Sequence, residues 1–174
     1  AVARFLDCPR VRAEGRRFPV EIRHFGRKDE RPLEVRVSAA VRSVTGNVLA
    51  FLPGVGEIER AAALLADFDV AVLHGELDGA AQDRALRAPE PGADRRRVVL
   101  ATNVAETSVT VEGVDTVVDC GLVRQAAWDP WSGLPTLTLA PIARDAAAQR
   151  AGRAGRLGPG SCLRLYSEGD HDSR

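Results

Sequence analysis

The sequence predicts an α/β fold in which a mostly parallel sheet is flanked by helices. Residues 48–52, 70–73 and 98–101 form short apolar runs typical of strands, and segments with helical spacing of apolar residues separate them. The first run contains no polar residue, as expected for a strand buried on both faces. Aromatic residues make up only 5% of the chain, and its abundant small apolar side chains suit helices packed on a sheet. Strands that alternate with helices favour right-handed parallel connections.

An edge strand and two helices are expected around the first apolar run. Residues 18–25 alternate in polarity like an edge or linking strand, in which a proline near the start is tolerated. After Pro32, which suits the first turn of a helix, apolar residues recur at helical spacing until about Gly46. Residues 57–66 have the same spacing. These patterns predict one helix before and one helix after the strand at residues 48–52.

A second group of elements begins with the strand at residues 70–73. Asp78 has the side chain of an N-cap and predicts the start of the next helix. A loop rich in Pro and Gly over residues 88–94 then leads to the strand at residues 98–101. Residues 116–118 form a fourth apolar run, which we expect to extend the same sheet.

The pattern changes after the fourth run. Residues 122–127 and 134–139 flank a turn segment that contains both tryptophans, Trp128 and Trp131, which predicts a β-hairpin instead of another crossover. An Ala-rich helix is expected from about residue 143, and residues 161–166 form the last strand. The hairpin is therefore an insertion in an otherwise parallel fold.

Length and composition limit the class of protein. A chain of 174 residues with 45% hydrophobic residues is sufficient for one domain with one core. Lys+Arg and Asp+Glu are both 24, so any contact with nucleic acid must be local. Three distant cysteines without a CxxC pair indicate a reduced protein without structural zinc. No apolar run approaches the roughly 20 residues of a membrane span, and residues 1–10 lack a signal-peptide core, so we expect a soluble, cytoplasmic protein without a membrane partner.

Residues 149–156 carry the strongest functional signal, because they read Gln-Arg-Ala-Gly-Arg-Ala-Gly-Arg. On a helix, offsets of four and seven would align Gln149, Arg153 and Arg156 in one polar stripe. The two glycines would cost this helix about 2 kcal/mol relative to Ala. The close approach of a ligand or of another backbone would explain that cost. The alternative is an Arg-rich helix that faces solvent.

Residues 101–114 follow a predicted strand directly, where α/β folds place their ligand loops. The small polar residues of this segment suit contacts to a phosphate backbone through hydroxyl and N–H groups. Taken alone, the segment is equally compatible with a capped turn and a short helix.

Together these segments resemble the second RecA-like lobe of DEAH-box helicases of superfamily 2, and most closely the bacterial HrpB-type branch. Residues 47–59 look like motif IV of that family, residues 101–114 like motif V and residues 149–156 like motif VI. Residues 73–77 and 117–121 look like its intermediate signatures. The resemblance implies a RecA-like lobe with the hairpin inserted between motifs V and VI.

The resemblance also implies roles for individual residues at an ATP site. Arg153 and Arg156 match the arginine fingers that meet the γ-phosphate, and Gln149 matches the residue that orients the attacking water. The implied contacts to the rest of the nucleotide come from Thr110, Glu112 and Gly152. The family more often has Asp where Glu112 stands.

The implied contacts to single-stranded RNA or DNA come from motifs IV and V. The matching residues are Pro53, Gly54, Thr102, Asn103 and Thr107. Whether the strand is RNA or DNA stays open at this point.

The sequence lacks the other half of an ATP site. Lys28 is the only lysine, and it lies outside any GxxxxGK[ST] loop; no Asp-Glu-Ala-His sequence occurs either. We therefore expect ATP and Mg²⁺ to be bound mainly by an N-terminal RecA-like lobe of the same polypeptide, with residues 1–17 as the linker from it. Residues 18–167 are the expected lobe, and residues 168–174 begin a linker to C-terminal accessory domains. A start without Met agrees with an excised fragment.

Some conspicuous residues have simpler explanations. His74 is expected to end a strand instead of binding a metal, because the other histidines lack ligand spacing. Residues 95–97 are three arginines, typical of a solvated loop, with a contact to phosphate as the alternative. Trp128 and Trp131 suit either stacking on bases or packing of the hairpin on its own lobe. Two rival functions remain, a self-contained nucleoside triphosphatase, which the missing P-loop disfavours, and a non-catalytic single-strand binding module.

Overall fold

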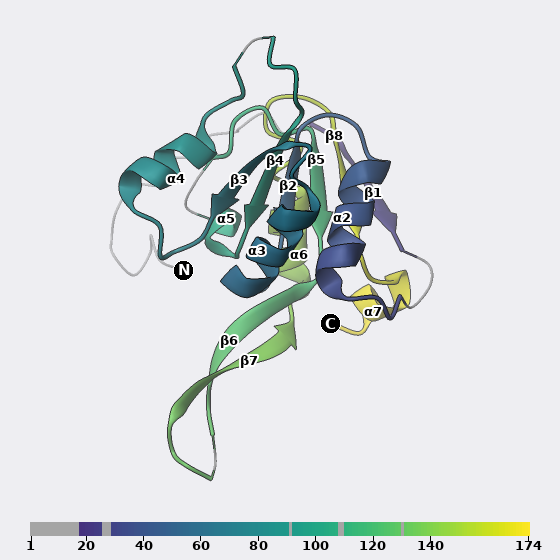
Figure 1. Cartoon of the computed structure of the whole chain (residues 1–174). Coiled ribbons are helices and arrows are strands. Elements are labelled where there is room, and N and C mark those ends of the chain that lie inside the picture. The colour runs from purple at the N-terminus through teal and green to yellow at the C-terminus, as the bar shows by residue number, and fades with distance from the viewer. Residues whose placement is uncertain (1–17, 26–28, 91, 108–109, 130) are drawn as a thin grey trace, which may run out of the picture.

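A six-stranded parallel sheet forms the centre of the molecule (Figure 1). The computed structural model describes residues 18–25, 29–90, 92–107, 110–129 and 131–174. Every pairing in this sheet is parallel. In spatial order its strands are β1 (Val20–His24), β8 (Gly160–Arg164), β5 (Thr116–Asp119), β2 (Val48–Phe51), β4 (Arg97–Ala101) and β3 (Asp69–Leu73).

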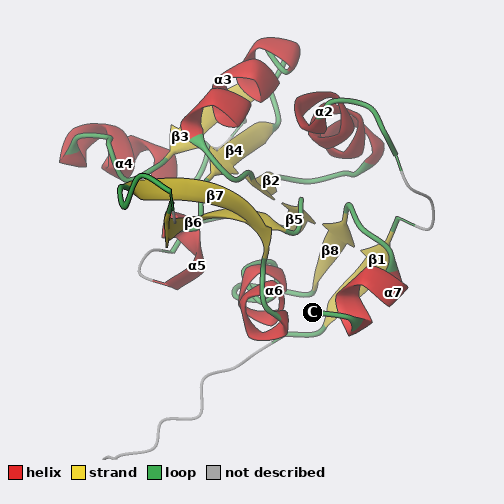
Figure 2. Cartoon of the chain, turned by 90° about the horizontal axis from the view of Figure 1, so that it is seen from below, coloured by secondary structure: helices red, strands yellow, loops and turns green. Residues whose placement is uncertain are grey.

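Helices cover both faces of the sheet, as the sequence predicts (Figure 2). Side chains from α2 (Leu33–Ser43) and α3 (Val55–Leu64) form one core cluster with the sheet. Side chains from α4 (Gly79–Leu86), α5 (Val104–Thr107) and α6 (Arg144–Ala151) take part in a second cluster on the opposite face. The fold is a RecA-like α/β lobe.

Strand β2 shows why a continuous apolar run is needed at the centre of the sheet. Its four residues are all buried. Val48 and Ala50 belong to the core cluster under α2 and α3, whereas Leu49 and Phe51 belong to the cluster on the other face. Because successive side chains of a strand point to opposite faces, a polar residue here would be buried on either side.

The helix boundaries agree with the predicted ones to within two residues, apart from those of α2 and α6. Asp78 is the N-cap of α4, and its Oδ1 accepts a hydrogen bond from the Ala81 amide at 2.7 Å. Pro32 occupies the N-cap of α2 instead of its first turn, and the helix ends at Ser43. Helix α3 begins at Val55, two residues earlier than the apolar spacing predicts.

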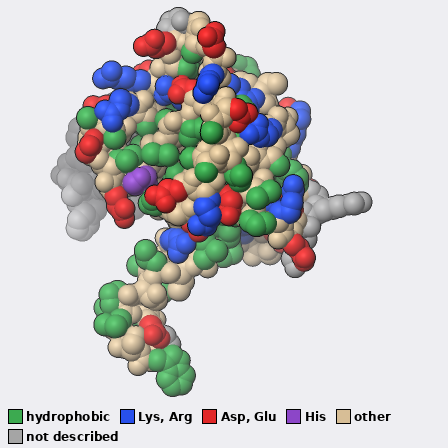
Figure 3. Space-filling view, in the orientation of Figure 1, with side chains coloured by type: hydrophobic (Ala, Val, Ile, Leu, Met, Phe, Trp, Pro, Cys, Tyr) green, Lys and Arg blue, Asp and Glu red, His purple; other side chains and the backbone are tan. Residues whose placement is uncertain are grey.

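The insertion after β5 is a hairpin of its own. Strands β6 (Leu122–Trp128) and β7 (Pro135–Pro141) pair antiparallel in a separate two-stranded sheet and project away from the lobe (Figure 1). Hydrophobic side chains gather along it (Figure 3). Trp128 is 73% exposed and Trp131 is 96% exposed, so the alternative in which they pack on their own lobe is wrong.

The sequence pattern did not predict the last helix, α7 (Glu168–Asp172). It begins with a capping box, in which Ser167 and Asp170 bond each other's backbone amides. Arg174 then donates hydrogen bonds to the carbonyl oxygens of Gly121 and Ile142, at 2.8 and 3.0 Å. These two residues flank the hairpin, so Arg174 contacts both ends of its base.

The arginine run at residues 95–97 is not the solvated loop that the sequence suggests. Arg96 donates hydrogen bonds to the Val41 and Val44 carbonyls at the C-terminal end of α2. Its guanidinium also lies over the Phe68 ring, 4.9 Å from the centroid. Arg97 pairs with Asp69 at 2.6 Å. Of the three arginines, Arg95 alone is exposed.

Other expectations concern cysteines, metals and membranes. Cys120 and Cys162 are free and buried, and Cys8 lies outside the described residues. His74 directly follows β3, and the described part of the chain contains no cluster of His, Cys, Asp or Glu that could hold a metal ion. None of the described helices combines the length and the apolar character needed to cross a membrane.

We predict that Arg96→Ala lowers the free energy of unfolding by about 1–3 kcal/mol, because it leaves carbonyl groups at the end of α2 without their donor. Urea denaturation of the purified chain measures the loss. Arg95→Ala is the matched control, since it removes the same charge one residue earlier without these contacts. Equal losses for the two variants would show that charge alone matters at this loop.

Candidate functional site

The carboxyl ends of the strands lie in one row. The parallel register aligns the last residues of five neighbouring strands, which are Leu73, Ala101, Phe51, Asp119 and Arg164. The loops that follow these strands therefore emerge at the same edge of the sheet, where α/β folds bind their ligands.

The predicted nucleic-acid loops meet at this edge. Pro53 and Gly54 follow β2, and Thr102 and Asn103 follow the adjacent β4. Backbone hydrogen bonds extend the sheet into both loops, because the Leu52 amide donates to Ala101 and the Thr102 amide donates to Leu73. Thr107 is the last residue of α5, and its side chain lies outside the described structure.

Motif VI is not one continuous helix, so the predicted stripe of Gln149, Arg153 and Arg156 is wrong as a helical feature. Helix α6 ends at Ala151, and the Arg153 amide then donates to the Arg150 carbonyl in a tighter turn. A Cβ on Gly155 would lie 2.7 Å from the Phe18 carbonyl oxygen. That glycine is explained by the close approach of another backbone.

The same residues nevertheless line one pocket of about 720 Å³ beside β1. The pocket gathers five of the predicted site residues, which are Thr110, Gln149, Gly152, Arg153 and Arg156. A hydrogen bond from Arg156 to the Thr110 hydroxyl joins motif VI to motif V. Glu112 does not line the pocket; its Oε2 accepts a hydrogen bond from the Ala88 amide at 3.3 Å.

The charged lining of this pocket is mostly positive. Arg153, Arg156 and Arg164 line it together with one carboxylate, that of Glu106. Burial lowers the pKa of Arg153, and the charge of Arg156 lowers it further. An anion between two neighbouring guanidinium groups relieves their repulsion, and phosphate oxygens accept hydrogen bonds from such groups in pairs.

Arg150, which no sequence pattern singled out, is the buried neighbour of this pocket. Its side chain is fully buried, and its guanidinium lies 4.8 Å from the centroid of the Phe51 ring. Its Nε donates to Glu106 Oε1 at 2.6 Å, and one Nη donates to Asp119 Oδ1 at 2.9 Å. Burial opposes the charged form of Arg150, but Asp119 and the other nearby anionic groups raise its pKa above the ordinary value.

Asp119 is the centre of this network. It is fully buried at the end of β5, and besides Arg150 it accepts hydrogen bonds from the Gly121 amide at 2.9 Å and the Tyr166 hydroxyl at 3.1 Å. The network therefore joins helices α5 and α6 to the first foot of the hairpin. The one available signal was a lone carboxylate directly after an apolar run, at residues 116–119.

We predict that Asp119→Ala lowers the free energy of unfolding by about 3–5 kcal/mol, because it leaves a buried guanidinium with too little negative charge. Asp119→Asn should be milder, since an amide oxygen still accepts a hydrogen bond. Urea denaturation measures both. Asp67→Ala is the control: Asp67 pairs with Arg42 at the surface, where both side chains are about half exposed, and its loss should barely move the midpoint. A control loss as large as that of Asp119→Ala would contradict the role of burial.

Comparison with known proteins finds relatives over most of the chain. The family model of the helicase conserved C-terminal domain matches residues 34–158. The chain is 42% identical over 171 residues to the ATP-dependent RNA helicase HrpB of Escherichia coli (strain K12). It is 35% identical over 179 residues to the pre-mRNA-splicing factor ATP-dependent RNA helicase prp22 of Schizosaccharomyces pombe.

The structural match is equally close. The crystal structure of the Escherichia coli DEAH/RHA helicase HrpB superimposes with a TM-score of 0.86 at 40% identity, covering 99% of this chain and 23% of that one. The sequence matches cover 93% of this chain and 21% of HrpB, and 94% of this chain and 15% of prp22. The chain thus spans about a fifth or less of the length of these relatives.

Proposed function

Because this chain belongs to the helicase conserved C-terminal domain family, and to its DEAH-box branch, we propose that it is the second RecA-like lobe of an ATP-dependent helicase. In the whole protein the lobe contributes arginines to ATP at the cleft between two lobes, and it binds the backbone of a single strand. The observation that carries the proposal is the pocket in which Arg153 and Arg156 meet Gln149 and Thr110.

The pocket residues fit a nucleoside triphosphate on chemical grounds. Arg153 and Arg156 present planar donor groups that match phosphate oxygens, and Gln149 carries an amide that can hold a water molecule. ATP supplies the phosphoryl group that is transferred. Charge at that group is neutralised by the two arginines, and an arginine finger is worth roughly 10³ to 10⁵ in rate.

The remaining phosphate and metal contacts belong to the N-terminal lobe in this proposal. The chain has no GxxxxGK[ST] sequence, whose lysine would reach the β- and γ-phosphates. Within the residues that the structure describes, no acidic cluster is suited to Mg²⁺. The second lobe alone is therefore proposed to be inactive as an ATPase, and its partners are the N-terminal lobe and the C-terminal accessory domains of the same polypeptide.

The strand-binding surface is proposed to be the edge at Pro53–Gly54 and Thr102–Asn103. At these neighbouring strand ends Gly54 and Asn103 carry backbone N–H groups, and Thr102 and Asn103 have small polar side chains, which suit a phosphate backbone without reading bases. The names of the relatives favour RNA, since both HrpB and prp22 are called RNA helicases.

A second candidate function is a single-strand binding module that acts without catalysis. The exposure of Trp128 and Trp131 favours it, because exposed aromatic rings stack on bases. The two functions differ in one measurement. A salt-dependent affinity for an oligonucleotide that is undiminished without the N-terminal lobe would favour the module.

We predict that the purified chain alone shows no ATP hydrolysis above background, with or without RNA, because it lacks groups for the β-phosphate and Mg²⁺. A phosphate-release assay at saturating ATP measures the rate. Mg²⁺-dependent turnover that disappears in the Arg156→Ala variant of this chain would refute the division between two lobes.

In the full-length protein we predict opposite effects at the two loops. Arg156→Ala should lower RNA-stimulated hydrolysis by orders of magnitude while nucleotide-free affinity for RNA changes little, because its charge is needed at the γ-phosphate. The double variant Thr102→Ala, Asn103→Ala should weaken strand binding and largely keep the basal rate. Arg153→Lys should retain little of the RNA-stimulated hydrolysis rate, because an ammonium group lacks the planar donor fork.

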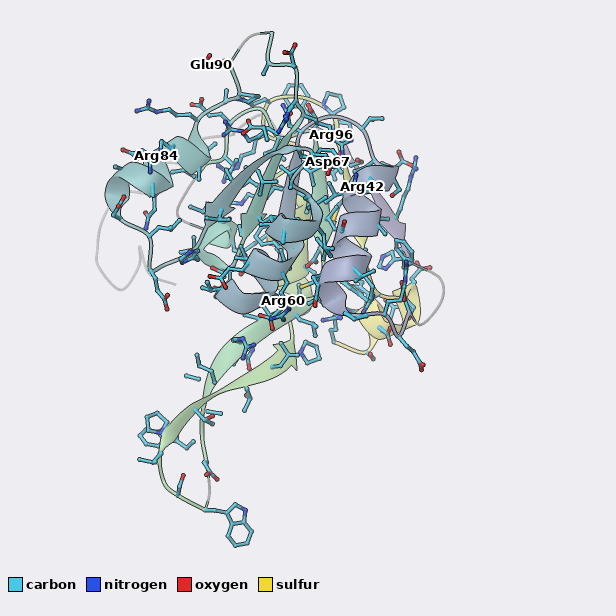
Figure 4. All side chains as sticks on the ribbon, viewed as in Figure 1. Arg42, Arg60, Asp67, Arg84, Glu90 and Arg96 are labelled. Carbon is cyan, nitrogen blue, oxygen red and sulfur yellow. The ribbon has the colours of Figure 1, made fainter. Side chains whose placement is uncertain are left out.

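Parallel measurements of affinity and turnover separate these outcomes. The control is Arg84→Ala, which removes an exposed arginine from α4 (Figure 4) and should change neither quantity. If Arg156→Ala lost strand affinity but kept full turnover, the assignment of the two loops would be reversed.

A further inference from the structure

Arg124, on strand β6 of the hairpin, reaches back to the loop at Pro53–Gly54. One of its Nη atoms donates to Glu57 Oε1 in the first turn of α3, at 3.1 Å. A Cβ built on Gly54 would lie 2.6 Å from the Nε of Arg124. The guanidinium therefore lies directly against Gly54, where a larger residue would displace it.

The two loops that are proposed to bind the strand, Pro53–Gly54 and Thr102–Asn103, contain no Lys or Arg. The residues that follow the nearby strands β3 and β5 read His74-Gly75-Glu76 and Cys120-Gly121. None of these is Lys or Arg. A single strand carries one negative charge per nucleotide, and affinity for it depends largely on cations that neutralise phosphates. Arg124 brings such a cation to this edge from the hairpin.

Glu57 can release Arg124 without losing its own ion pair. The same Oε1 that accepts from Arg124 also accepts from Arg60 on α3, at 3.3 Å. Arg60 is held in place by Glu34 at 3.0 Å, and it lies at the foot of the hairpin (Figure 4). The side chain of Arg124 is 41% exposed, whereas that of Glu57 is only 15% exposed. Arg124 is therefore the more accessible partner of this ion pair.

We propose that Arg124 is a nucleic-acid-binding residue that exchanges the Glu57 carboxylate for a backbone phosphate of the bound strand. The proposal rests on the proposed function, and it adds to the two loops a contact from the hairpin. A backbone phosphate offers the guanidinium fork two non-bridging oxygens, as many as a carboxylate has, and Glu57 keeps Arg60 when Arg124 turns to the strand.

The test uses the full-length protein and a single-stranded homopolymeric oligouridylate without nucleotide. Its dissociation constant is measured by fluorescence anisotropy over a range of KCl concentrations. In Arg124→Gln the slope of log affinity against log salt should become shallower by about 0.7, as expected for one lost phosphate contact on a single strand. Affinity should fall several-fold at low salt and approach the wild-type value at high salt. Arg124→Lys should keep the slope.

Two matched variants separate a phosphate contact from a positioning role. Arg60→Gln removes the other arginine on the same Glu57 oxygen and should leave the slope unchanged. Glu57→Gln removes the ion pair but keeps Arg124; it should preserve the slope and bind at least as tightly as the wild type. If Glu57→Gln lowered the slope as Arg124→Gln does, Arg124 would act only through the ion pair and the proposal would be wrong.

The outcomes for this contact and for the proposed function differ. An unchanged slope in Arg124→Gln, in a protein that still hydrolyses ATP in response to RNA, would overturn the Arg124 contact alone. A wild-type protein without RNA-stimulated hydrolysis and without a salt-dependent affinity would overturn both.

Discussion

The buried ion pair between Arg150 and Asp119 is the constraint on which both proposed sites depend. Two fully buried charges at 2.9 Å are stable only while each has the other and their remaining hydrogen-bonding groups are satisfied. Those further partners are Glu106, Leu122, Gly121 and Tyr166, which come from segments far apart in the chain. Any rearrangement that separates α6 from β5 would leave an unpaired charge buried in the apolar core. The geometry of the pocket and that of the strand edge are therefore fixed relative to each other.

This network lies between the two proposed ligands. On one side Glu106 and the end of α6 contribute to the pocket with Arg153 and Arg156; on the other, Asp119 ends the strand beside β2, whose next loop carries Gly54. The hairpin begins at Leu122, whose carbonyl accepts a hydrogen bond from Arg150. One buried side chain, that of Arg150, thus connects the end of α6 to the base of the hairpin.

Local patterns were sufficient for most of the fold. The apolar run at β2 and the Asp78 cap are determined by neighbouring residues, so they can be read in the sequence, and the ordered motifs identified the family. The features that were missed depend on contacts over long sequence distances. Arg150 and Arg96 resemble any other arginine until distant carboxylates and carbonyls surround them. Helix α6 ends at Ala151, and Gly155 then lies against the Phe18 carbonyl, a contact that no local spacing encodes. The roles of Arg153, Arg156 and the strand-edge residues stay predictions.

The hairpin has a spectroscopic consequence. Both tryptophans of the chain lie on it, and they are solvent-exposed in the folded protein. Unfolding of the sheet moves neither indole from an apolar to an aqueous environment. Tryptophan fluorescence should therefore change little while the core unfolds. An approaching base, a neighbouring domain or any other surface that covers the tip would quench or shift that emission strongly. Tryptophan fluorescence of this chain should therefore report binding at the hairpin and should be insensitive to unfolding of the lobe.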